Sequence, residues 1–449
     1  MPDTSENRLL ELLADKPRPA RELLQALAVS QPTLSRMVAR SGSRIVTLGR
    51  SKSTCYGRPR AIRGRGSVFP VYQVDEAGDA HSFGTLTSVW ERHYWWEPAV
   101  GPSHLYSSLP WFVQDMRPDG FVGRAFAQRL HHELEVPLRL QDWNDDDTLT
   151  AVIRRGEDCV GNLIAGTESL ERYFRNTQSG MAPLRRVDSA GEYPRLAHEA
   201  LAGDPVGSSA GGEQPKFTTL IDNAGELQHL LVKFSPDITT VEGRRWADLL
   251  ICEHLALETM REAGYSAADS TIIESGNRVY LEVVRFDRVG LHGRRPLYSL
   301  GVVDDEFFGR RDSWVGVAGR LEAAKMLSRQ DASALRWLAL FGDLIANTDQ
   351  HFGNVSLIPE DSAQRRFILA PAYDMLPMYY RLRDVASAET AYQPPSSASL
   401  TEWHSALQAA ATFWARAAAD GRISVEFRTI CRLNRDRIIS MTALPRRVA

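Results

Sequence analysis

Two carboxylates and one amide occur in this sequence at a spacing that suits phosphoryl transfer. Asp349 and Asn354 lie five positions apart, and Asp374 follows twenty positions later. In phosphoryl-transfer sites one carboxylate orients the attacking hydroxyl, while an amide and a second carboxylate hold magnesium. The spacing therefore predicts an ATP-dependent kinase in which Asp349 is the catalytic base and Asn354 and Asp374 bind Mg²⁺.

The same residue types also have an ordinary structural explanation. A lone Asp or Asn more often caps a helix or forms a turn than it does chemistry. The argument for catalysis is the order in which the features occur along the chain. A Gly/Ser-rich loop comes first, then a lysine in an apolar run, a strand with a polar exit, and finally the three site residues.

Lys233 is the residue expected to reach the ATP phosphates. It lies in the apolar run 227–236, which predicts a buried strand. A buried ammonium group needs a partner, because burying it unpaired is costly. The predicted helix 246–264 offers Asp248, Glu253 and Glu258, and the sequence does not choose among them.

The segment 207–220 is rich in Gly and Ser and leads into a predicted strand. Glycine lets backbone N–H groups approach a phosphate, so Gly211 and Gly212 are predicted to contact ATP, together with Gln214 and Lys216. The segment has neither a Walker A pattern nor GxGxxG, and a plain surface loop is the alternative. Farther along, strands at 270–273 and 278–284 predict a hairpin, after which Val284 and Phe286 would meet the adenine edge.

The first 65 residues are basic, with 13 Lys and Arg against 5 Asp and Glu, whereas the whole chain has a net charge of -3. Three short helices are predicted at 6–16, 20–28 and 33–40, followed by two strand-like runs around a turn. This order predicts a winged helix-turn-helix that binds DNA. Its third helix would present five DNA-contacting residues, Gln31, Thr33, Ser35, Arg36 and Arg40.

The basic tail 58–65 suits a DNA backbone or a minor groove. The alternative is a small helical protein-interaction domain followed by a solvated basic linker. Residues 68–166 combine short strands with clustered aromatics and predict a scaffold subdomain. Within it the aspartate run 145–147 is expected to be a solvated turn.

Hydrophobic residues make up 43% and charged residues 24% of the 449 positions, as in ordinary globular proteins. The four cysteines are far apart and form no metal-ligand spacing. The first residues resemble no secretion signal, and no apolar run approaches the length of a membrane span. A cytoplasmic protein with reduced thiols and no membrane partner is expected.

The ordered motifs resemble those of HipA-family serine/threonine kinases. Residues 209–216 are similar to the SxxGxQxK loop of that family, and Val232-Lys233, residues 285–288, residues 347–354 and residues 370–374 are similar to its other signatures, in the same order. The resemblance implies that Lys233 contacts ATP, that Asp349 and His351 are catalytic, and that Tyr373 lies at the cofactor. It also implies autophosphorylation at Ser209 or the adjacent Ser208.

The family likeness implies a toxin of a toxin-antitoxin system that phosphorylates a protein, with a translation component as the kind of target. It also allows for an antitoxin partner and for a homodimer. Val284 departs from the family pattern, which often has Glu there. The helix-turn-helix at the front is a second departure, and it resembles the longer YjjJ-like branch.

The fold is thus expected to be α+β, a two-lobed protein-kinase-like HipA fold preceded by a winged helix-turn-helix. The predicted division is 1–66 for DNA binding, 67–166 for the scaffold, 167–288 for the N-lobe and 289–449 for the helical C-lobe. A transcriptional regulator whose kinase-like body senses a ligand or dimerises is the alternative function. The joint presence of Lys233, Asp349, Asn354 and Asp374 favours the kinase.

Overall fold

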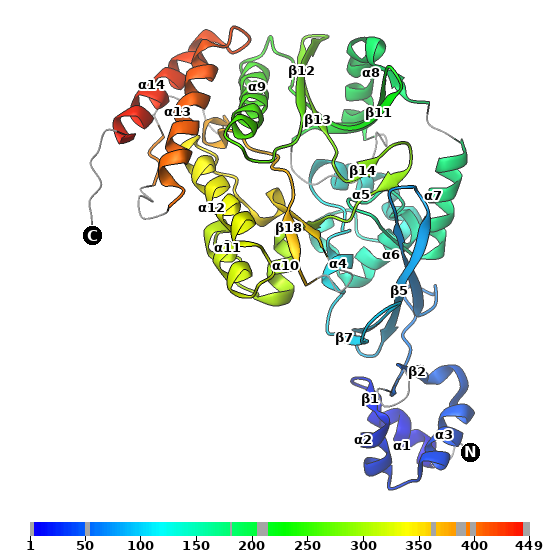
Figure 1. Ribbon diagram of the computed structural model, residues 1–449. Helices are drawn as coiled ribbons and strands as arrows, with labels where there is room; N and C mark the ends of the chain where they lie inside the picture. The colour runs from blue at the N-terminus through cyan, green and yellow to red at the C-terminus, as the bar shows by residue number, and fades with distance from the viewer. Residues whose placement is uncertain are drawn as a thin grey trace.

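The computed structural model describes residues 4–49, 54–179, 182–203, 214–360, 365–382, 392–395 and 401–442. Its α+β architecture has a small N-terminal module, a strand-rich scaffold and two further lobes (Figure 1). The bounds of the four predicted domains stay predictions. No helix in these ranges combines the length and the apolar character needed to cross a bilayer.

The N-terminal module packs three short helices against a small sheet. The helices bury Leu9, Leu23 and Leu34 completely, since these leucines fall on the inner face of each helix. The elements are α1 (Thr4–Leu12), β1 (Arg18–Pro19), α2 (Ala20–Leu27), α3 (Gln31–Ser41), β2 (Val46–Leu48) and β3 (Cys55–Gly57), with sheet order β1-β3-β2. The three predicted helices and the two strand-like runs are present, and the assignment to DNA-binding winged helix-turn-helix proteins stays a prediction.

The module rests on the scaffold through its strands. Leu48 of β2 packs in one apolar cluster with Val89 and Trp95 of the scaffold. The scaffold sheet has the order β7-β6-β5-β4-β8 and comprises β4 (Val68–Val74), β5 (Ala80–Val89), β6 (His93–Pro98), β7 (His104–Tyr106) and β8 (Leu163–Ala165). Its helices are α4 (Trp111–Gln114), α5 (Gly120–Leu134), α6 (Asp145–Arg155) and α7 (Thr167–Ser179).

The prediction of a solvated turn at 145–147 is wrong. These aspartates form the first turn of α6, where Asn144 and Asp147 complete a capping box. The turn binds the basic tail that the sequence assigned to DNA, through ion pairs of Arg60 with Asp146 and of Arg63 with Asp147. Asp147 is 1% exposed, so this contact is part of the packed structure.

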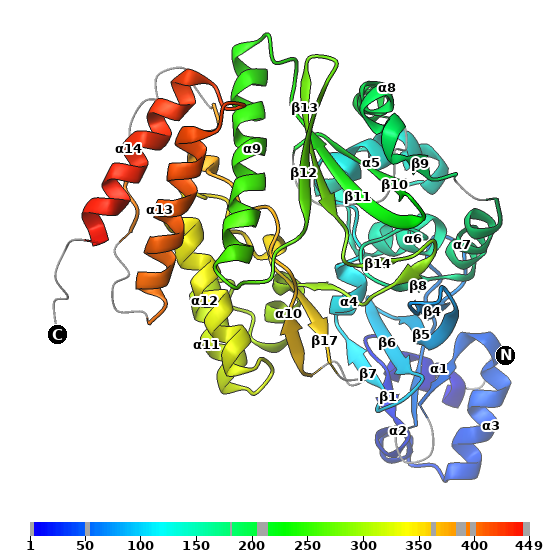
Figure 2. The same ribbon diagram turned by 45° about the horizontal axis from the view of Figure 1, so that its top comes forward.

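The N-lobe is a five-stranded sheet of order β12-β13-β11-β10-β9. Its strands are β9 (Leu184–Arg185), β10 (Lys216–Asn223), β11 (Glu226–Phe234), β12 (Ser270–Ser275) and β13 (Arg278–Val284), with α8 (Ser189–Ala202) and α9 (Val241–Glu262). The predicted hairpin is confirmed, and it turns at Gly276 and Asn277, which both have positive φ (+53° and +57°) as a type I′ turn requires. Figure 2 shows α9 between this sheet and α13.

The C-lobe is mainly helical. It comprises α10 (Leu300–Phe307), α11 (Trp314–Ala323), α12 (Arg329–Leu344), α13 (Trp403–Ala419) and α14 (Val425–Thr442). A small sheet of order β16-β17-β18 joins β16 (Tyr298–Ser299), β17 (Ser356–Pro359) and β18 (Phe367–Leu369). The residues between α12 and β17 carry the predicted catalytic motif. Strand β18 ends at Leu369, and beyond it Ala372 forms an isolated bridge with Ala267.

Candidate active site

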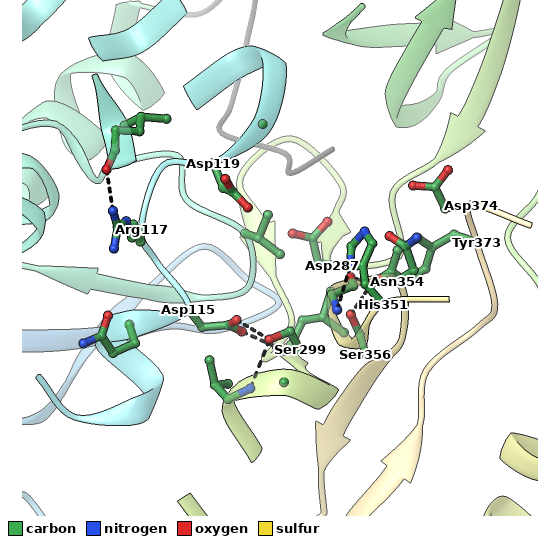
Figure 3. Close-up of a pocket in the computed structure, with 18 of the residues that line it drawn as sticks. Asp115, Arg117, Asp119, Asp287, Ser299, His351, Asn354, Ser356, Tyr373 and Asp374 are labelled. Carbon is green, nitrogen blue, oxygen red and sulfur yellow. Dashed lines mark hydrogen bonds between the residues drawn. The ribbon is translucent and has the colours of Figure 1, made fainter. Parts of the chain in front are cut away.

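A cavity of about 1210 Å³ lies where the N-lobe sheet, the C-lobe and the scaffold meet (Figure 3). Strands β10, β11 and β13 supply one wall, the segment after α12 supplies another, and α4, α5 and α10 supply the rest. The predicted site residues that line it are Lys216, Lys233, Val284, Phe286, His351, Asn354, Tyr373 and Asp374. Residues distributed over 160 positions of the sequence therefore converge on one space.

Lys233 is the centre of the buried charge in this cavity. Its Nζ donates to both carboxylate oxygens of Glu253, at 2.7 and 2.9 Å, and to Oδ1 of Asp374 at 2.6 Å. Lys233 is 3% exposed and Glu253 is fully buried. Burial alone would lower the pKa of Lys233, but the charges of Asp374 and Glu253 outweigh it and raise that pKa, so the ammonium stays charged.

The structure resolves the partner that the sequence left open. Glu253 of α9 faces Lys233, whereas Asp248 accepts hydrogen bonds from the backbone N–H and the hydroxyl of Ser424. Glu258 lies 3.6 Å from the ring of His254. A strand lysine paired with a helix carboxylate and a distal aspartate is the arrangement that positions ATP phosphates in kinases.

The segment that carries Asp349 is fixed by its own side chains. Asn347 accepts a hydrogen bond from the backbone N–H of Asp349 at 3.0 Å, and the Asn354 amide nitrogen donates to the Asp349 carbonyl at 2.8 Å. Because the nitrogen of Asn354 is occupied in this way, its amide oxygen is the atom left for a cation. Asp349 itself is half-buried and does not line the cavity, while His351 is exposed and does.

Asp374 reaches the cavity from an unusual backbone conformation. Its φ of +56° lies in the left-handed region that residues with a side chain seldom adopt. Burial would raise the pKa of Asp374, but Lys233 and then Lys216 outweigh burial and lower it. Asp374 is therefore a carboxylate at neutral pH, the form that binds a hard cation.

The oxygens of Asn354 and Asp374 suit Mg²⁺, which takes few protein ligands and keeps several waters. Within the described ranges no group of three or more His, Cys, Asp or Glu side chains could hold a metal. The two predicted ligands fit a magnesium ion that a nucleotide also binds.

Of the other predicted cofactor contacts, some lie in the cavity and others do not. Lys216 is buried directly across from Lys233 on the paired strands β10 and β11. The N–H of Val284 already donates to the Asp269 carbonyl at 2.8 Å, so it is not free for adenine. Gln214 is half-buried outside the lining of the cavity, and Ser208, Ser209, Gly211 and Gly212 lie outside the described residues.

On the N-terminal module, the predicted DNA-contacting residues share one accessible face of α3. Gln31, Ser35, Arg36 and Arg40 are exposed, and Thr33 is half-buried. The hydroxyl of Thr33 lies 3.0 Å from that of Ser30 and 3.4 Å from the Arg36 guanidinium. The face is therefore presented as predicted, and its role stays a prediction.

Sequence reasoning missed the supports of the site. Asp287 accepts hydrogen bonds from Arg285, Arg288 and the backbone N–H of Gly161, and these contacts tie the end of β13 to the scaffold. Although burial would raise the pKa of Asp287, the two arginines lower it. The repeated Arg and Asp of residues 285–288 were the available signal for such a cluster.

Two further carboxylates support the catalytic segment and its neighbours. Asp115 accepts hydrogen bonds from the backbone N–H and the hydroxyl of Ser299, where α10 begins. Asp343, near the end of α12, accepts a hydrogen bond from the Gln350 amide at 2.7 Å. No local pattern in the sequence marks either pair.

Comparison with known proteins identifies the family. A model of the YjjJ-like toxin middle domain matches residues 65–174, and a model of the HipA-like C-terminal domain matches residues 208–432. Toxin YjjJ of Escherichia coli (strain K12) is 37% identical over 432 residues, which cover 94% of this chain and 95% of that protein. The chain belongs to the YjjJ-like toxins of the HipA family. The resemblance drawn from its motifs is thereby confirmed.

A solved HipA structure agrees with the fold of this HipA-family chain. A chain of the HipA, HipB and operator DNA complex from Shewanella oneidensis MR-1 matches with a TM-score of 0.50 at 16% identity. The match covers 83% of the present chain and 100% of that chain. The proinflammatory kinase CtkA of Helicobacter pylori also matches, with a TM-score of 0.37 and 13% identity over 52% of the HipA-family chain and 94% of CtkA. The match to the HipA complex confirms the predicted HipA fold, and the winged helix-turn-helix stays a prediction.

Proposed function

We propose that this chain is an ATP- and Mg²⁺-dependent serine/threonine protein kinase that acts as a toxin. The observation that carries the proposal is the buried contact of Lys233 with both Glu253 and Asp374 beside Asn354. A binding or sensing body has no need to keep a desolvated cation, its carboxylate partner and two cation ligands together. The family membership and the confirmed fold support the same conclusion.

Each residue then has a separate task. Lys233 holds the α- and β-phosphates of ATP, and Glu253 keeps the ammonium group aimed into the cavity. Asn354 and Asp374 hold magnesium, which when bound neutralises charge on the phosphates. Phe286, at the end of the strand that leads out of the N-lobe, lies at the nucleotide base.

Asp349 acts on the acceptor hydroxyl of the protein substrate. The hydroxyl oxygen forms the new bond to the γ-phosphorus while the bond from that phosphorus to the β-γ bridging oxygen breaks, and the proton moves to the Asp349 carboxylate. His351 lies next to this position, exposed on the cavity side.

Intact-mass analysis of the purified chain with Mg²⁺ and ATP tests this proposal. We expect added phosphate on the chain, at Ser209 or Ser208, and its loss in Asp349→Asn. Asp436→Asn is the matched control, since Asp436 lies on the surface of α14, where it pairs with the adjacent Arg435. A wild-type chain that phosphorylates neither itself nor any protein in a cell extract would refute the kinase.

DNA binding is a second proposed activity, and the exposed face of α3 favours it. The solved complex that matches this chain contains HipB and operator DNA, and we extend an antitoxin and a DNA partner to the present chain as proposals. Arg36→Ala combined with Arg40→Ala should weaken binding to duplex DNA and reduce its salt dependence, because both arginines are exposed. Unchanged binding would show that α3 does not contact DNA, and DNA binding without any kinase activity would favour the transcriptional regulator.

A further inference from the structure

The two predicted magnesium ligands come from separate segments, and something must hold them at a fixed separation. Strands β17 and β18 pair as far as Leu369, and the last backbone bond between the two segments joins the Ala370 N–H to the Ser356 carbonyl at 3.0 Å. Beyond it Ala372 bonds to Ser266 and Ala268 of another part of the N-lobe. Within the described ranges, no backbone bond aligns Asp374 with Asn354.

The side chain of Tyr373 crosses this gap. Its hydroxyl donates to the Gly353 carbonyl at 2.9 Å and lies 2.7 Å from the Ser356 hydroxyl. Gly353 immediately precedes Asn354, and Tyr373 immediately precedes Asp374. One hydroxyl therefore connects residues adjacent to both ligands, and Figure 3 shows Tyr373 beside Asn354 and Ser356.

The hydrogen-bond roles in this contact follow from the number of protons. The phenol has one proton, so when it donates to the Gly353 carbonyl it accepts the proton of Ser356. The ring also packs against Phe286, with centroids 6.0 Å apart, so both ends of the side chain are held.

Asp374 needs such a restraint more than most residues. Its backbone lies in the left-handed region, and its Oδ1 bonds to Lys233 on the side of the N-lobe. Tyr373, the residue before Asp374, is held against the catalytic segment of the C-lobe by its hydroxyl. The Asp374 carboxylate is thus fixed from both lobes at once.

We propose that the Tyr373 hydroxyl, together with Ser356, is a positioning group that sets the separation of Asn354 and Asp374 for one shared Mg²⁺. This inference rests on the proposed kinase function. It differs from the sequence prediction, in which Tyr373 contacts the cofactor. The two roles are separable, because Phe keeps the ring and removes only the hydroxyl.

Calorimetric titration of ATP into the full chain, at a series of Mg²⁺ concentrations and with EDTA, tests the proposal. Tyr373→Phe and Ser356→Ala should each raise the Mg²⁺ concentration for half-maximal ATP binding by about tenfold or more, as supports of metal ligands do. The double variant should add little to either single change, because both remove the same contact. ATP binding in EDTA should be unchanged, since it depends on Lys233.

Tyr379→Phe is the matched control. Tyr379 is also a tyrosine of the C-lobe and is 39% exposed, and within the described ranges no hydrogen bond to its hydroxyl is present. It should leave the Mg²⁺ dependence at the wild-type value. A Tyr373→Phe chain with wild-type Mg²⁺ dependence would overturn the positioning role alone. A wild-type chain whose ATP binding ignores Mg²⁺ would overturn the proposed function, and the positioning role with it.

Discussion

Asp343 should make the stability of the C-lobe depend on pH in a way that Asn at this position abolishes. Burial raises its pKa from 3.8 to about 6, and the hydrogen bond from Gln350 only partly opposes this. A carboxyl group whose folded pKa is raised stabilises the fold fully below pH 3.8, and this contribution is lost as the pH rises through 6. The rise from 3.8 to about 6 corresponds to about 3 kcal/mol of unfolding free energy lost at pH 7.5. At pH 5, which lies between these two values, the loss is smaller, on the order of 1–2 kcal/mol.

Asp343→Asn keeps an oxygen for the Gln350 amide and removes the charge. The variant should therefore gain stability relative to the wild type as the pH rises, by on the order of 1 kcal/mol between pH 5 and pH 7.5. Urea unfolding followed by tryptophan fluorescence at the two pH values measures this, because α12 carries Trp337 in the same helix.

Asp312→Asn is a control of opposite sign. A hydrogen bond from Arg320 lowers the pKa of Asp312 to about 2, so this side chain is charged at both pH values. Asp312→Asn should destabilise the fold equally at pH 5 and pH 7.5. A difference between Asp343→Asn and the wild type that stays constant across this range would show that Asp343 is not a raised carboxyl, and the reasoning from burial would be refuted.

Two other predictions concern ion pairs that support the fold. Asp287→Asn should lower the thermal unfolding midpoint, with a loss on the order of 3 kcal/mol, because buried Arg285 and Arg288 would both lose their ion pair with Asp287, while Arg288 keeps the one with Asp158; a midpoint within a degree of the wild type would contradict this. Asp147→Asn should speed tryptic cleavage after Arg63, measured by mass spectrometry of timed digests, because that arginine loses its ion pair; equal cleavage rates would mean that the ion pair does not hold the linker.

Much of the site was predictable because its residues have a fixed order and spacing along the chain. Lys233, Asn354 and Asp374 were predicted to converge, and they line one cavity. Each occurs in a short segment whose sequence predicts its local structure. This is a buried strand for Lys233 and a polar turn for Asn354. Local sequence sufficed there because the local backbone points each side chain into the cavity.

Pairings between distant segments could not be predicted in the same way. The choice of Glu253 over Asp248 depends on how α9 is rotated, and α9 is buried on almost every side, so no apolar stripe reveals its orientation. The ion pair of Arg63 with Asp147 joins positions 84 apart, and each partner alone looks like a solvated charge. The contact of Asp343 with Gln350 was also missed, although only seven positions separate them, because it depends on how the chain turns after α12.

The ion pairs between the linker and α6 have a consequence for any measurement of DNA affinity. A cationic side chain that binds DNA from solution displaces condensed counterions, and each such contact makes the affinity fall more steeply with salt. Arg60 and Arg63 already face the carboxylates of Asp146 and Asp147, so moving them to phosphates would exchange one anion for another. The arginines of α3 should therefore contribute to the slope of DNA affinity against salt concentration, whereas Arg60 and Arg63 of the linker should not. An observer who counted every positive charge in the first 65 residues would overestimate the ions released.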